Sequence, residues 1–319
     1  MDLSVVIPVL DEVEVLPALC ARLTPALDAL GLSWEVVFVD DGSRDGSFAA
    51  LSGLHARDPR FGVVALSRNF GQQIALQAGL VRARGRAVVL MDADLQDPPE
   101  RIADLVAKWR EGNDVVYAVR SSRDGESLFK RVSAAGFYRV VRWLAPVDLP
   151  VDAGDFRLLS RTVVDAIVAM PERHRYLRGL VAWTGFRQAQ VTYDRGPRAA
   201  GLTKYPLRRM GRLASDAIVS FSTVPLRAAT VLGFSLSAAC FAYAAWAIFV
   251  TLAFGRHVPG WASLLVAILL VGGAQLVCLG IIGEYIGRIY DEVRHRPLYL
   301  VRAELLGDAP KMRAIGDVQ

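Results

Sequence analysis

Short apolar, β-branched runs alternate with longer helix-period segments over the first 120 residues of the chain. The apolar runs cover residues 3–9, 34–40, 61–67, 86–92 and 114–119, and the helical segments lie at about 12–30, 44–57, 70–84 and 98–111. Strands that alternate with helices form βαβ units and a mostly parallel sheet. Because such crossovers are right-handed, the helices cover both faces of the sheet. The predicted class is α/β, with three layers.

The pattern changes after residue 206. Between 207 and 227, apolar residues recur at helical spacing, at Met210, Leu213, Ala214, Ala217, Ile218 and Phe221. Arginines occupy other positions, which favours an amphipathic helix at a membrane interface over an ordinary core-facing helix. Two uncharged stretches follow, at 228–254 and 261–282. Each exceeds the roughly 20 residues that cross a bilayer, so a transmembrane hairpin is favoured over a buried helix pair in a soluble protein.

These patterns divide the chain into four parts: an α/β domain at 1–206, an interface helix at 207–227, a transmembrane hairpin at 228–287 and a C-terminal tail at 288–319. Arginines flank the hairpin on both sides, with Arg227 before it and Arg288 and Arg294 after it. The positive-inside rule therefore places both flanks in the cytoplasm. The N-terminus opens directly into a strand pattern without a signal peptide, which also indicates a cytoplasmic front domain on the inner membrane.

Composition agrees with a membrane protein. Hydrophobic residues make up 53% of the chain, the excess follows residue 227, and the formal net charge is +5. A basic protein can bind nucleic acid, a membrane surface or phosphate substrates, and the hydrophobic C-terminal third favours the membrane and no nucleic acid. Cys20, Cys240 and Cys278 form no C-x-x-C pair, which argues against a disulfide framework or a zinc site.

Two carboxylates follow the fourth predicted strand. Asp92 and Asp94 are two residues apart, so in an extended segment they leave on the same face. Paired carboxylates repel each other unless a cation lies between them, and hard oxygen ligands suit Mg²⁺ or Mn²⁺. An isolated D-x-D can also be an ordinary turn or helix cap.

The other predicted strands also end in polar residues. Pro8 to Glu12 follows the first strand, Asp40 to Ser43 the second, and Ser67 to Gln72 the third. Carboxyl ends of parallel strands meet at one edge, where open α/β sheets bind ligands. Turn chemistry explains any one of these ends, but all four together predict a ligand crevice. Because the chain has no G-x-G-x-x-G after the first strand and no Walker motif, carboxylates and a metal would have to hold a nucleotide there.

The string Asp-Ala-Asp-Leu-Gln-Asp-Pro-Pro-Glu at 92–100 resembles the D-x-D segment of family 2 glycosyltransferases. It is most similar to the branch that loads a sugar onto a polyprenyl phosphate, as GtrB-type undecaprenyl-phosphate glucosyltransferases and, more distantly, dolichol-phosphate mannose synthases do. The resemblance implies a GT-A (nucleotide-diphospho-sugar transferase) fold for the front domain. It also implies that Asp92, Asp94 and Gln96 hold the metal on the donor diphosphate, with Asp94 taking part in catalysis.

The same resemblance assigns further donor contacts. Pro8, Glu12 and Asp40 match the residues that contact the nucleoside, while Asp11 stands where the family usually has Asn. The segment at 195–205 resembles the family's R-x-x-G-x-[ST]-K-[YW] string, which closes over the diphosphate. The matching donor-binding residues there are Arg198, Lys204 and Tyr205.

Basic residues at 120–142 match the part of the family that receives the lipid phosphate. We expect Arg120 and Arg131, with Lys130 as an alternate, to hold that phosphate, because the arginine fork suits phosphate oxygens. The run can also be a solvated charged face.

Gly-Asp-Phe-Arg-Leu at 154–158 resembles the family segment whose Asp is the usual candidate for a catalytic base, here Asp155. A phosphate monoester has its second pKa near ~6, so the acceptor is already mostly a dianion at neutral pH. Asp155 can therefore orient the acceptor or support the metal instead, or simply begin a strand.

The resemblance implies inverting, metal-dependent transfer of a sugar to undecaprenyl phosphate, with UDP-glucose as the first choice of donor. Galactose, N-acetylhexosamines and mannose from GDP-mannose stay open, as does a catalytically silent nucleotide-sugar-binding subunit. A processive polysaccharide synthase would need more spans and a Q-x-x-R-W string, and the sequence has neither. A flippase would need more than the one hairpin that each chain contains, unless several chains pool their spans. Related proteins suggest a homo-oligomer, namely a tetramer.

Overall fold

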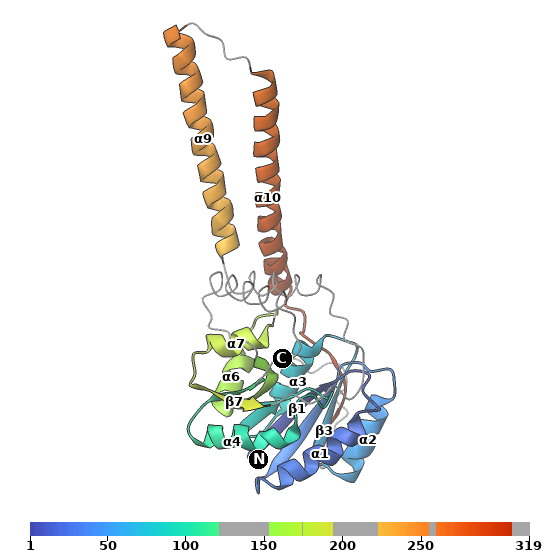
Figure 1. Cartoon of the computed structure of the whole chain (residues 1–319). Helices are drawn as coiled ribbons and strands as arrows, with labels where there is room; N and C mark the ends of the chain where they lie inside the picture. The colour runs from blue at the N-terminus through green and yellow to red at the C-terminus, as the bar shows by residue number, and fades with distance from the viewer. Residues whose placement is uncertain (121–152, 174, 194–222, 255–259, 308–319) are drawn as a thin grey trace. The chain divides into compact units, whose positions relative to one another are not determined.

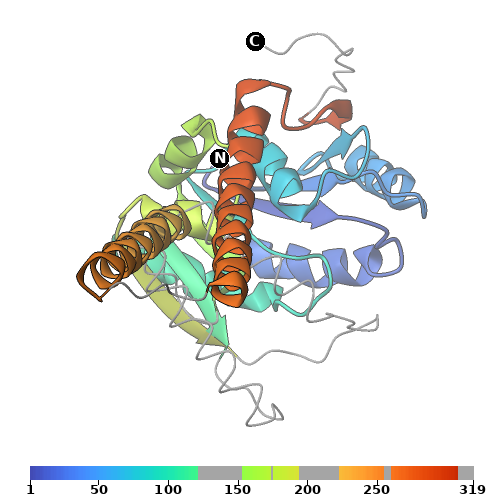
Figure 2. The ribbon, with the colours of Figure 1, turned by 90° about the horizontal axis from the view of Figure 1, so that it is seen from above.

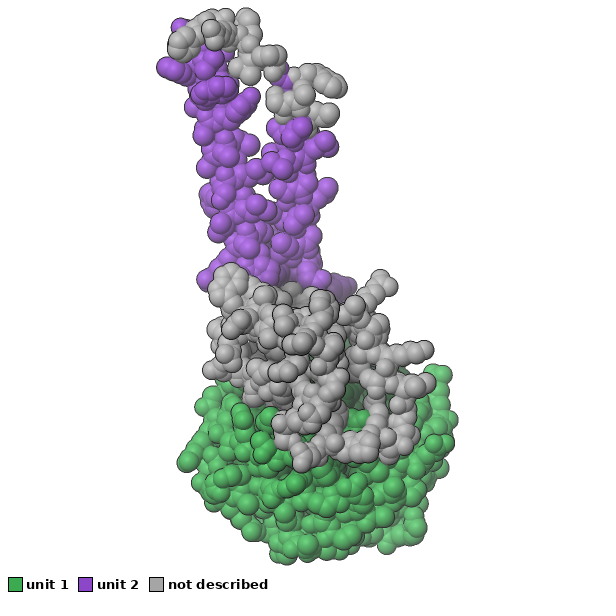
Figure 3. All heavy atoms as spheres, in the orientation of Figure 1, with its two compact units in different colours: residues 1–139, 147–207, 296–319 green, residues 140–146, 208–295 purple. Residues whose placement is uncertain are grey.

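The computed structural model describes residues 1–120, 153–173, 175–193, 223–254 and 260–307 (Figure 1). The chain divides into two compact units. One unit contains residues 1–139, 147–207 and 296–319, and the other contains residues 140–146 and 208–295 (Figure 3). The first unit is therefore assembled from segments on both sides of the second one in sequence.

The first unit is built on an eight-stranded sheet in the order β7-β5-β6-β4-β1-β2-β3-β8. The strands are β1 Leu3–Val9, β2 Trp34–Asp40, β3 Phe61–Leu66, β4 Ala87–Leu90, β5 Val115–Arg120, β6 Ala153–Ser160, β7 Gln188–Tyr193 and β8 Val301–Leu305. The central strands β4, β1, β2 and β3 are parallel, whereas β6 runs antiparallel to β4 and β5, and β8 antiparallel to β3. The predicted α/β class and the parallel centre of the sheet are confirmed.

Helices cover both faces of this sheet (Figures 1 and 2). The helices of the unit are α1 Leu16–Asp28, α2 Ser47–Arg57, α3 Gln72–Arg82, α4 Ile102–Arg110, α6 Arg161–Ala169 and α7 Leu177–Trp183, with a 3-10 turn, η1, at Pro99–Arg101. One hydrophobic cluster joins α1, α2 and α4 to one face, and a second joins α3, α6 and α7 to the other. Alternate strand residues enter the two clusters, as the pleat of a doubly covered sheet requires.

Helix α3 lies very close to strand β1. A Cβ on Gly79 would be 2.2 Å from Cγ1 of Val6 and 3.1 Å from Cγ2 of Val39, and both valines are buried. The absence of a side chain at this position therefore allows the helix backbone to approach the sheet. This close packing fixes α3, whose first residue follows the loop at the carboxyl end of β3.

The second unit contains two long apolar helices, α9 Val224–Phe254 and α10 Trp261–Val293. Both are long and apolar enough to cross a membrane. They pack against each other, with the Cys278 thiol 3.7 Å from the carbonyl oxygen of Ala229, and large apolar side chains such as Phe234, Phe241 and Leu252 are exposed. The two predicted spans lie within these helices.

The two helices extend beyond the predicted spans, α9 at its start and α10 at its end. Residues 224–227, assigned to the interface helix, form the first turn of α9, and residues 207–222 lie outside the described part of the chain. Helix α10 continues to Val293, beyond the end of the predicted span at residue 282. In this last part of the helix, Glu284 and Arg288 form an i,i+4 ion pair at 3.4 Å, which is compatible with a helical conformation.

The predicted C-terminal tail contains a strand. Residues Val301–Leu305 form β8 at the edge of the sheet, next to β3. Arg302 and Glu304 interrupt its apolar residues, so the segment has no continuous hydrophobic run that would reveal a strand. The sequence analysis therefore did not predict that the C-terminal tail at 288–319 contributes a strand to the sheet.

Candidate active site

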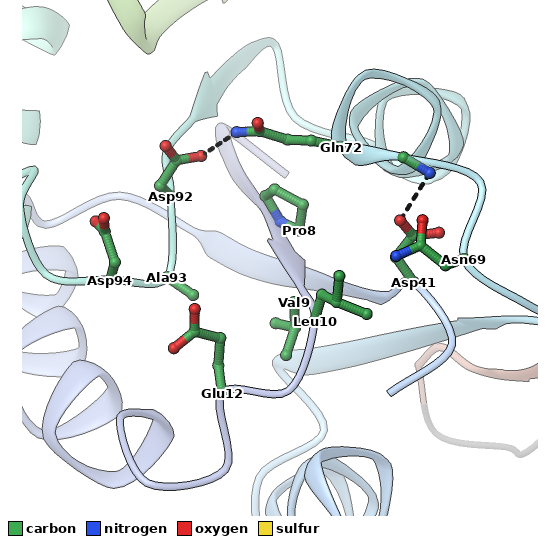
Figure 4. A pocket seen from close by; sticks show the side chains of 11 residues that line it. Pro8, Val9, Leu10, Glu12, Asp41, Asn69, Gln72, Asp92, Ala93 and Asp94 are labelled. Carbon is green, nitrogen blue, oxygen red and sulfur yellow. Dashed lines mark hydrogen bonds between the residues drawn. The ribbon is translucent and has the colours of Figure 1, made fainter. Parts of the chain in front are cut away.

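A pocket of about 330 Å³ opens at the carboxyl ends of the central parallel strands (Figure 4). Its lining residues come from the end of β1 and from the segments that follow β1, β2, β3 and β4. They are Pro8, Val9, Leu10, Glu12, Asp41, Asn69, Gly71, Gln72, Asp92, Ala93 and Asp94. Four strand ends therefore meet at one crevice, as the sequence predicted.

Asp92 and Asp94 lie on the same side of this pocket, after the end of β4, and Glu12 lies near them (Figure 4). Gln72 at the start of α3 donates a hydrogen bond from Nε2 to Asp92 Oδ1 at 2.6 Å. Asp94 Oδ1 accepts a hydrogen bond from the backbone N–H of Gln96 at 3.1 Å. The D-x-D segment thus forms a turn and also lines the pocket. Its interpretation as an ordinary turn and its interpretation as part of a ligand site are therefore compatible.

Burial, together with the neighbouring carboxylates of Asp155, Asp97 and Asp94, raises the pKa of Asp92 to about 7. The Gln72 hydrogen bond opposes this effect without cancelling it. Repulsion between these carboxylates would be relieved by a cation, and oxygen ligands suit a hard divalent ion. Within the described ranges, no cluster of three or more His, Cys, Asp or Glu residues has a metal-binding arrangement. Asp92 and Asp94 are the two carboxylates of the D-x-D segment that line the pocket.

Asp155 reaches the same region from β6. Strand β6 pairs antiparallel with β4, with Arg157 opposite Leu90, and this brings Asp155 toward Asp92. The Arg178 guanidinium on α7 donates to both oxygens of Asp155, at 2.9 and 3.2 Å, and buried Arg157 lies 3.5 Å away. Burial alone would raise the pKa of Asp155, but these arginines lower it below its usual value. Asp155 is therefore held as a carboxylate.

The aspartate that ends β2 and the one that follows it differ in their position relative to the pocket. Asp41 lines the pocket, and its carboxylate accepts the backbone N–H groups of Phe70 and Gly71 at 2.7 and 2.8 Å. Asp40, the predicted nucleoside contact, is fully buried beneath the lining; it accepts the Ser43 N–H at 3.0 Å and lies 3.5 Å from Arg302. Burial raises the pKa of Asp41, and its two backbone hydrogen bonds oppose this shift.

The loop after β1 is held by side chains of the loop after β2. Asp11 has a φ of 55°, its backbone N–H donates to Ser43 Oγ at 3.0 Å, and its Oδ1 accepts the Arg44 N–H at 2.7 Å. Asp and Asn adopt this left-handed conformation more readily than most residues. Asp11 can therefore take the place of an Asn in this turn, next to the pocket residue Glu12.

The structure places the remaining predicted residues as follows. Pro8, Glu12, Asp92 and Asp94 line the pocket, whereas Gln96 is buried and is not one of the lining residues. The backbone of Arg120 ends β5. The other predictions lie outside the described residues, at Lys130, Arg131, Arg198, Lys204 and Tyr205.

The polar character of the strand ends was the signal by which the sequence analysis placed the segments with Asp41, Asn69 and Gln72 at a ligand crevice, and all three residues line the pocket. It did not single out these three as individual site residues. Arg178 had no such signal, because its partner Asp155 lies 23 positions earlier in the chain.

A family model described as "Glycosyl transferase family 2" matches residues 4–168, and one described as "GtrB C-terminal hairpin" matches residues 224–289. The chain belongs to glycosyl transferase family 2. Its sheet, with parallel strands and helices on both faces, is the GT-A-like fold expected of this family. With its apolar hairpin, this family 2 glycosyltransferase is a membrane-associated enzyme.

Several relatives match this glycosyltransferase over nearly its whole length. An uncharacterized glycosyltransferase, sll0501, of Synechocystis sp. is 48% identical over 301 residues, which are 94% of this chain and 95% of the relative. The bactoprenol glucosyl transferase of Shigella phage SfV is 41% identical over 304 residues, 95% of this chain and 99% of the relative. A solved structure, glucosyl-3-phosphoglycerate synthase from Mycobacterium tuberculosis, has a TM-score of 0.48 and 22% identity, covering 68% of this chain and 78% of that one.

Proposed function

We propose that this glycosyltransferase transfers a sugar, with glucose as the first choice, from a nucleotide-diphospho-sugar to a polyprenyl phosphate. The full-length similarity to bactoprenol glucosyl transferases supports the lipid acceptor and the glucosyl group. The observation that carries the proposal is the pocket at the strand ends, where Asp92 and Asp94 face a space large enough for part of a nucleotide sugar. UDP-glucose is the proposed donor.

Asp92 and Asp94 are the proposed ligands of Mg²⁺ or Mn²⁺. Such a cation neutralises charge on a leaving diphosphate. Burial and the crowding of carboxylates around Asp92 together raise its pKa to about 7, and the crowding supports a cation at this point. Gln96 stays a candidate third ligand, while Pro8, Glu12 and Asp40 shape the nucleoside side.

In the proposed reaction an oxygen of the acceptor phosphate attacks the anomeric carbon while the bond from that carbon to the diphosphate oxygen breaks, which inverts the anomeric centre. A phosphate monoester is mostly a dianion at neutral pH, so no base has to remove a proton. Asp155 is bound by Arg178 and Arg157, which suits an orienting role better than proton transfer. Arg120, Lys130 and Arg131 are the proposed acceptor-phosphate residues, and Arg198, Lys204 and Tyr205 the proposed donor-loop residues.

The test uses the full chain in detergent, undecaprenyl phosphate and a panel of radiolabelled nucleotide sugars, with label counted in the organic phase. We expect glucose from UDP-glucose to become extractable, and EDTA to abolish transfer until Mg²⁺ or Mn²⁺ is restored. Asp94→Asn should lower turnover by at least about a hundredfold, since it removes charge stabilisation at the leaving group. Asp104→Asn, on the exposed surface of α4, is the matched control.

Near-normal turnover of folded Asp94→Asn would remove the metal assignment. Transfer of a different sugar would correct the donor. Binding of donors without any transfer would favour the silent-subunit alternative.

The proposed location is the inner membrane, with both flanks of the hairpin in the cytoplasm, and the proposed assembly is a homotetramer. In a background without the native cysteines, Arg296→Cys should resist a membrane-impermeant thiol reagent added outside intact spheroplasts, whereas His257→Cys should react. Labelling of Arg296→Cys from outside would reverse the proposed orientation. Light scattering of the detergent-corrected mass tests the tetramer.

A further inference from the structure

The C-terminal strand β8 contacts two loops that build the pocket. It follows the second apolar helix in sequence but belongs to the unit that contains the sheet. The backbone N–H of Ser67, at the start of the loop after β3, donates to the Leu300 carbonyl at 2.8 Å. Arg302 lies 3.5 Å from Asp40, at the end of β2. The two loops after β2 and β3 supply Asp41, Asn69, Gly71 and Gln72 to the pocket.

A β-bulge directs Arg302 toward Asp40. Ala65 is paired with Ala303 and Leu66 with Val301, so Arg302 is the extra residue on β8. Leu305 packs into the cluster under α2, and Val301 into the cluster on the opposite face. The Arg302 guanidinium lies on the α2 side, 4.9 Å from the centre of the Phe48 ring. Bulges re-aim side chains and are common beside active sites, which is the arrangement seen here.

Asp40 needs a fixed positive partner. Its side chain is fully buried, whereas the Arg302 side chain is 50% exposed. Within the part of the chain that the structure describes, Arg302 is the cation paired with Asp40. A buried carboxylate is costly unless it is paired and hydrogen-bonded, and the second hydrogen bond comes from the Ser43 N–H at 3.0 Å. The conformation of the turn at 40–43 is therefore coupled to Arg302.

This turn is connected to the rest of the pocket. Ser43 Oγ accepts the Asp11 N–H next to Glu12, and Asp41 accepts the N–H groups of Phe70 and Gly71. The backbone of Gly42 is so close to Arg68 that a Cβ there would be 2.6 Å from the Arg68 carbonyl carbon. A displacement of Asp40 would therefore move the walls of the nucleoside side of the pocket.

We propose that Arg302 is a positioning residue for the nucleoside diphosphate of the donor: it fixes the buried Asp40 carboxylate and, through it, the loops that line the pocket. The inference rests on the proposed function and extends it to a residue beyond the second apolar helix. Arginine suits the task because its guanidinium stays charged while partly exposed and its planar fork limits the ways in which it can pair.

A purely structural role of β8 is the competing explanation, and the strand contains a matched control for it. Glu304 lies on the opposite face of β8 and pairs with Arg82 of α3 at 3.5 Å. Its side chain is 22% exposed, and its pairing attaches the same strand to the same unit without contacting Asp40. Loss of the Glu304 pair therefore reports strand attachment alone.

The experiment measures UDP-glucose binding by calorimetry with Mg²⁺ present, and the donor and acceptor KM values, using the full chain in detergent. We expect Arg302→Ala to raise the Kd and the donor KM about tenfold while the KM for undecaprenyl phosphate is unchanged. Arg302→Lys should give an intermediate Kd, because it keeps the charge and loses the fork. Glu304→Gln should bind UDP-glucose like the parent chain.

A double-mutant cycle tests whether Arg302 acts through Asp40. In an Asp40→Asn background, Arg302→Ala should add less than twofold to the Kd, because its partner charge is gone. A full additional effect there, or an equal effect of Glu304→Gln and Arg302→Ala, would overturn the inference. If Arg302→Ala does not fold, Arg302→Lys must still raise the Kd above that of Glu304→Gln.

The experiment distinguishes failure of the proposed function from failure of the inference about Arg302. A parent chain that neither binds UDP-glucose nor transfers glucose overturns the proposed donor and the inference together. A parent chain that does both, with Arg302→Ala and Arg302→Lys unchanged in Kd, overturns the inference alone.

Discussion

Asp92 and Asp155 are both buried carboxylates, yet their neighbours shift their pKa values in opposite directions. Burial raises the pKa of each, and Asp92 faces further carboxylates, whereas Asp155 is held by Arg178 and Arg157. The sequence identified both acids from strand-end spacing and a family resemblance. It could not identify Arg178, because no local pattern links a residue on α7 to a strand that begins at Ala153. The protonation state of each acid is thus a tertiary property.

Arg178→Met should destabilise the protein by about 2 kcal/mol at neutral pH, because it leaves a buried carboxylate with a weaker partner while the partial exposure of Arg178 limits the loss. The folded pKa of Asp155 is lowered, so the ion pair contributes stability above the unfolded pKa of about 3.9. The stability gap between parent and variant should therefore shrink as the pH falls through the lower, folded value. Thermal unfolding in detergent across pH measures this gap.

The matched control for that experiment is Arg101→Met, which breaks an exposed pair with Asp104 and should cost less than about 0.5 kcal/mol. Equal losses for the two variants, or a gap that grows on acidification, would show that the Asp155 pair does not contribute as described.

Alanine substitutions at Gly42 and Gly46 distinguish the cost of backbone strain from the cost of a steric clash with a neighbouring backbone. Both have positive φ, 79° and 96°, but a Cβ on Gly42 would meet the Arg68 backbone, whereas a Cβ on Gly46 would have nothing within 4 Å. Gly46→Ala should cost about 1 kcal/mol from strain alone. Gly42→Ala should cost about 3 kcal/mol and also weaken UDP-glucose binding, because the two pocket loops must separate. Equal unfolding temperatures for the two variants would rule out the close contact of these loops.

At the scale of elements, the βα units up to β5 were predictable within a few residues. Their strands are continuous apolar runs because both faces of the sheet are covered, and their helices carry apolar residues at the helical period. Strands β6, β7 and β8 were not predicted as members of the sheet. In β8, Arg302 and Glu304 alternate with small or apolar residues, which is typical of an edge strand and gives no distinctive local signal. Likewise, turn spacing identified the D-x-D wall, whereas the buried position of Asp40 depends on a partner 262 residues away.

Because α3 packs closely on β1, we predict that glycine-to-alanine substitutions at two helical positions change the free energy of unfolding in opposite directions. Gly79→Ala should destabilise by about 2 kcal/mol, because its Cβ would overlap the buried Val6 side chain. Gly53→Ala, within α2, has nothing within 4 Å of its Cβ and should stabilise by about 0.5 to 1 kcal/mol through helix propensity. Thermal unfolding checks both, and a stabilised Gly79→Ala would contradict the close approach of α3.

At the scale of the whole molecule, the unit that holds the pocket needs segments from both sides of the apolar hairpin in sequence. A chain that ends at His295 lacks β8, which leaves the β3 edge unpaired and Asp40 and Arg82 without Arg302 and Glu304. We expect this shortened chain to aggregate in detergent and to lose UDP-glucose binding. A chain that ends at Gly307 keeps β8 and serves as the control. A monodisperse 1–295 chain with normal affinity would show that β8 is dispensable.

The place of β8 in the chain also sets an order of events during translation. The ribosome makes residues 301–305 after both apolar helices, so a nascent chain cannot close the β3 side of its sheet until the hairpin has been synthesised. Until then β3 presents open backbone groups, which chaperones and proteases recognise more readily than a paired edge. A chain that terminates before residue 301 therefore lacks the strand that pairs with the β3 edge.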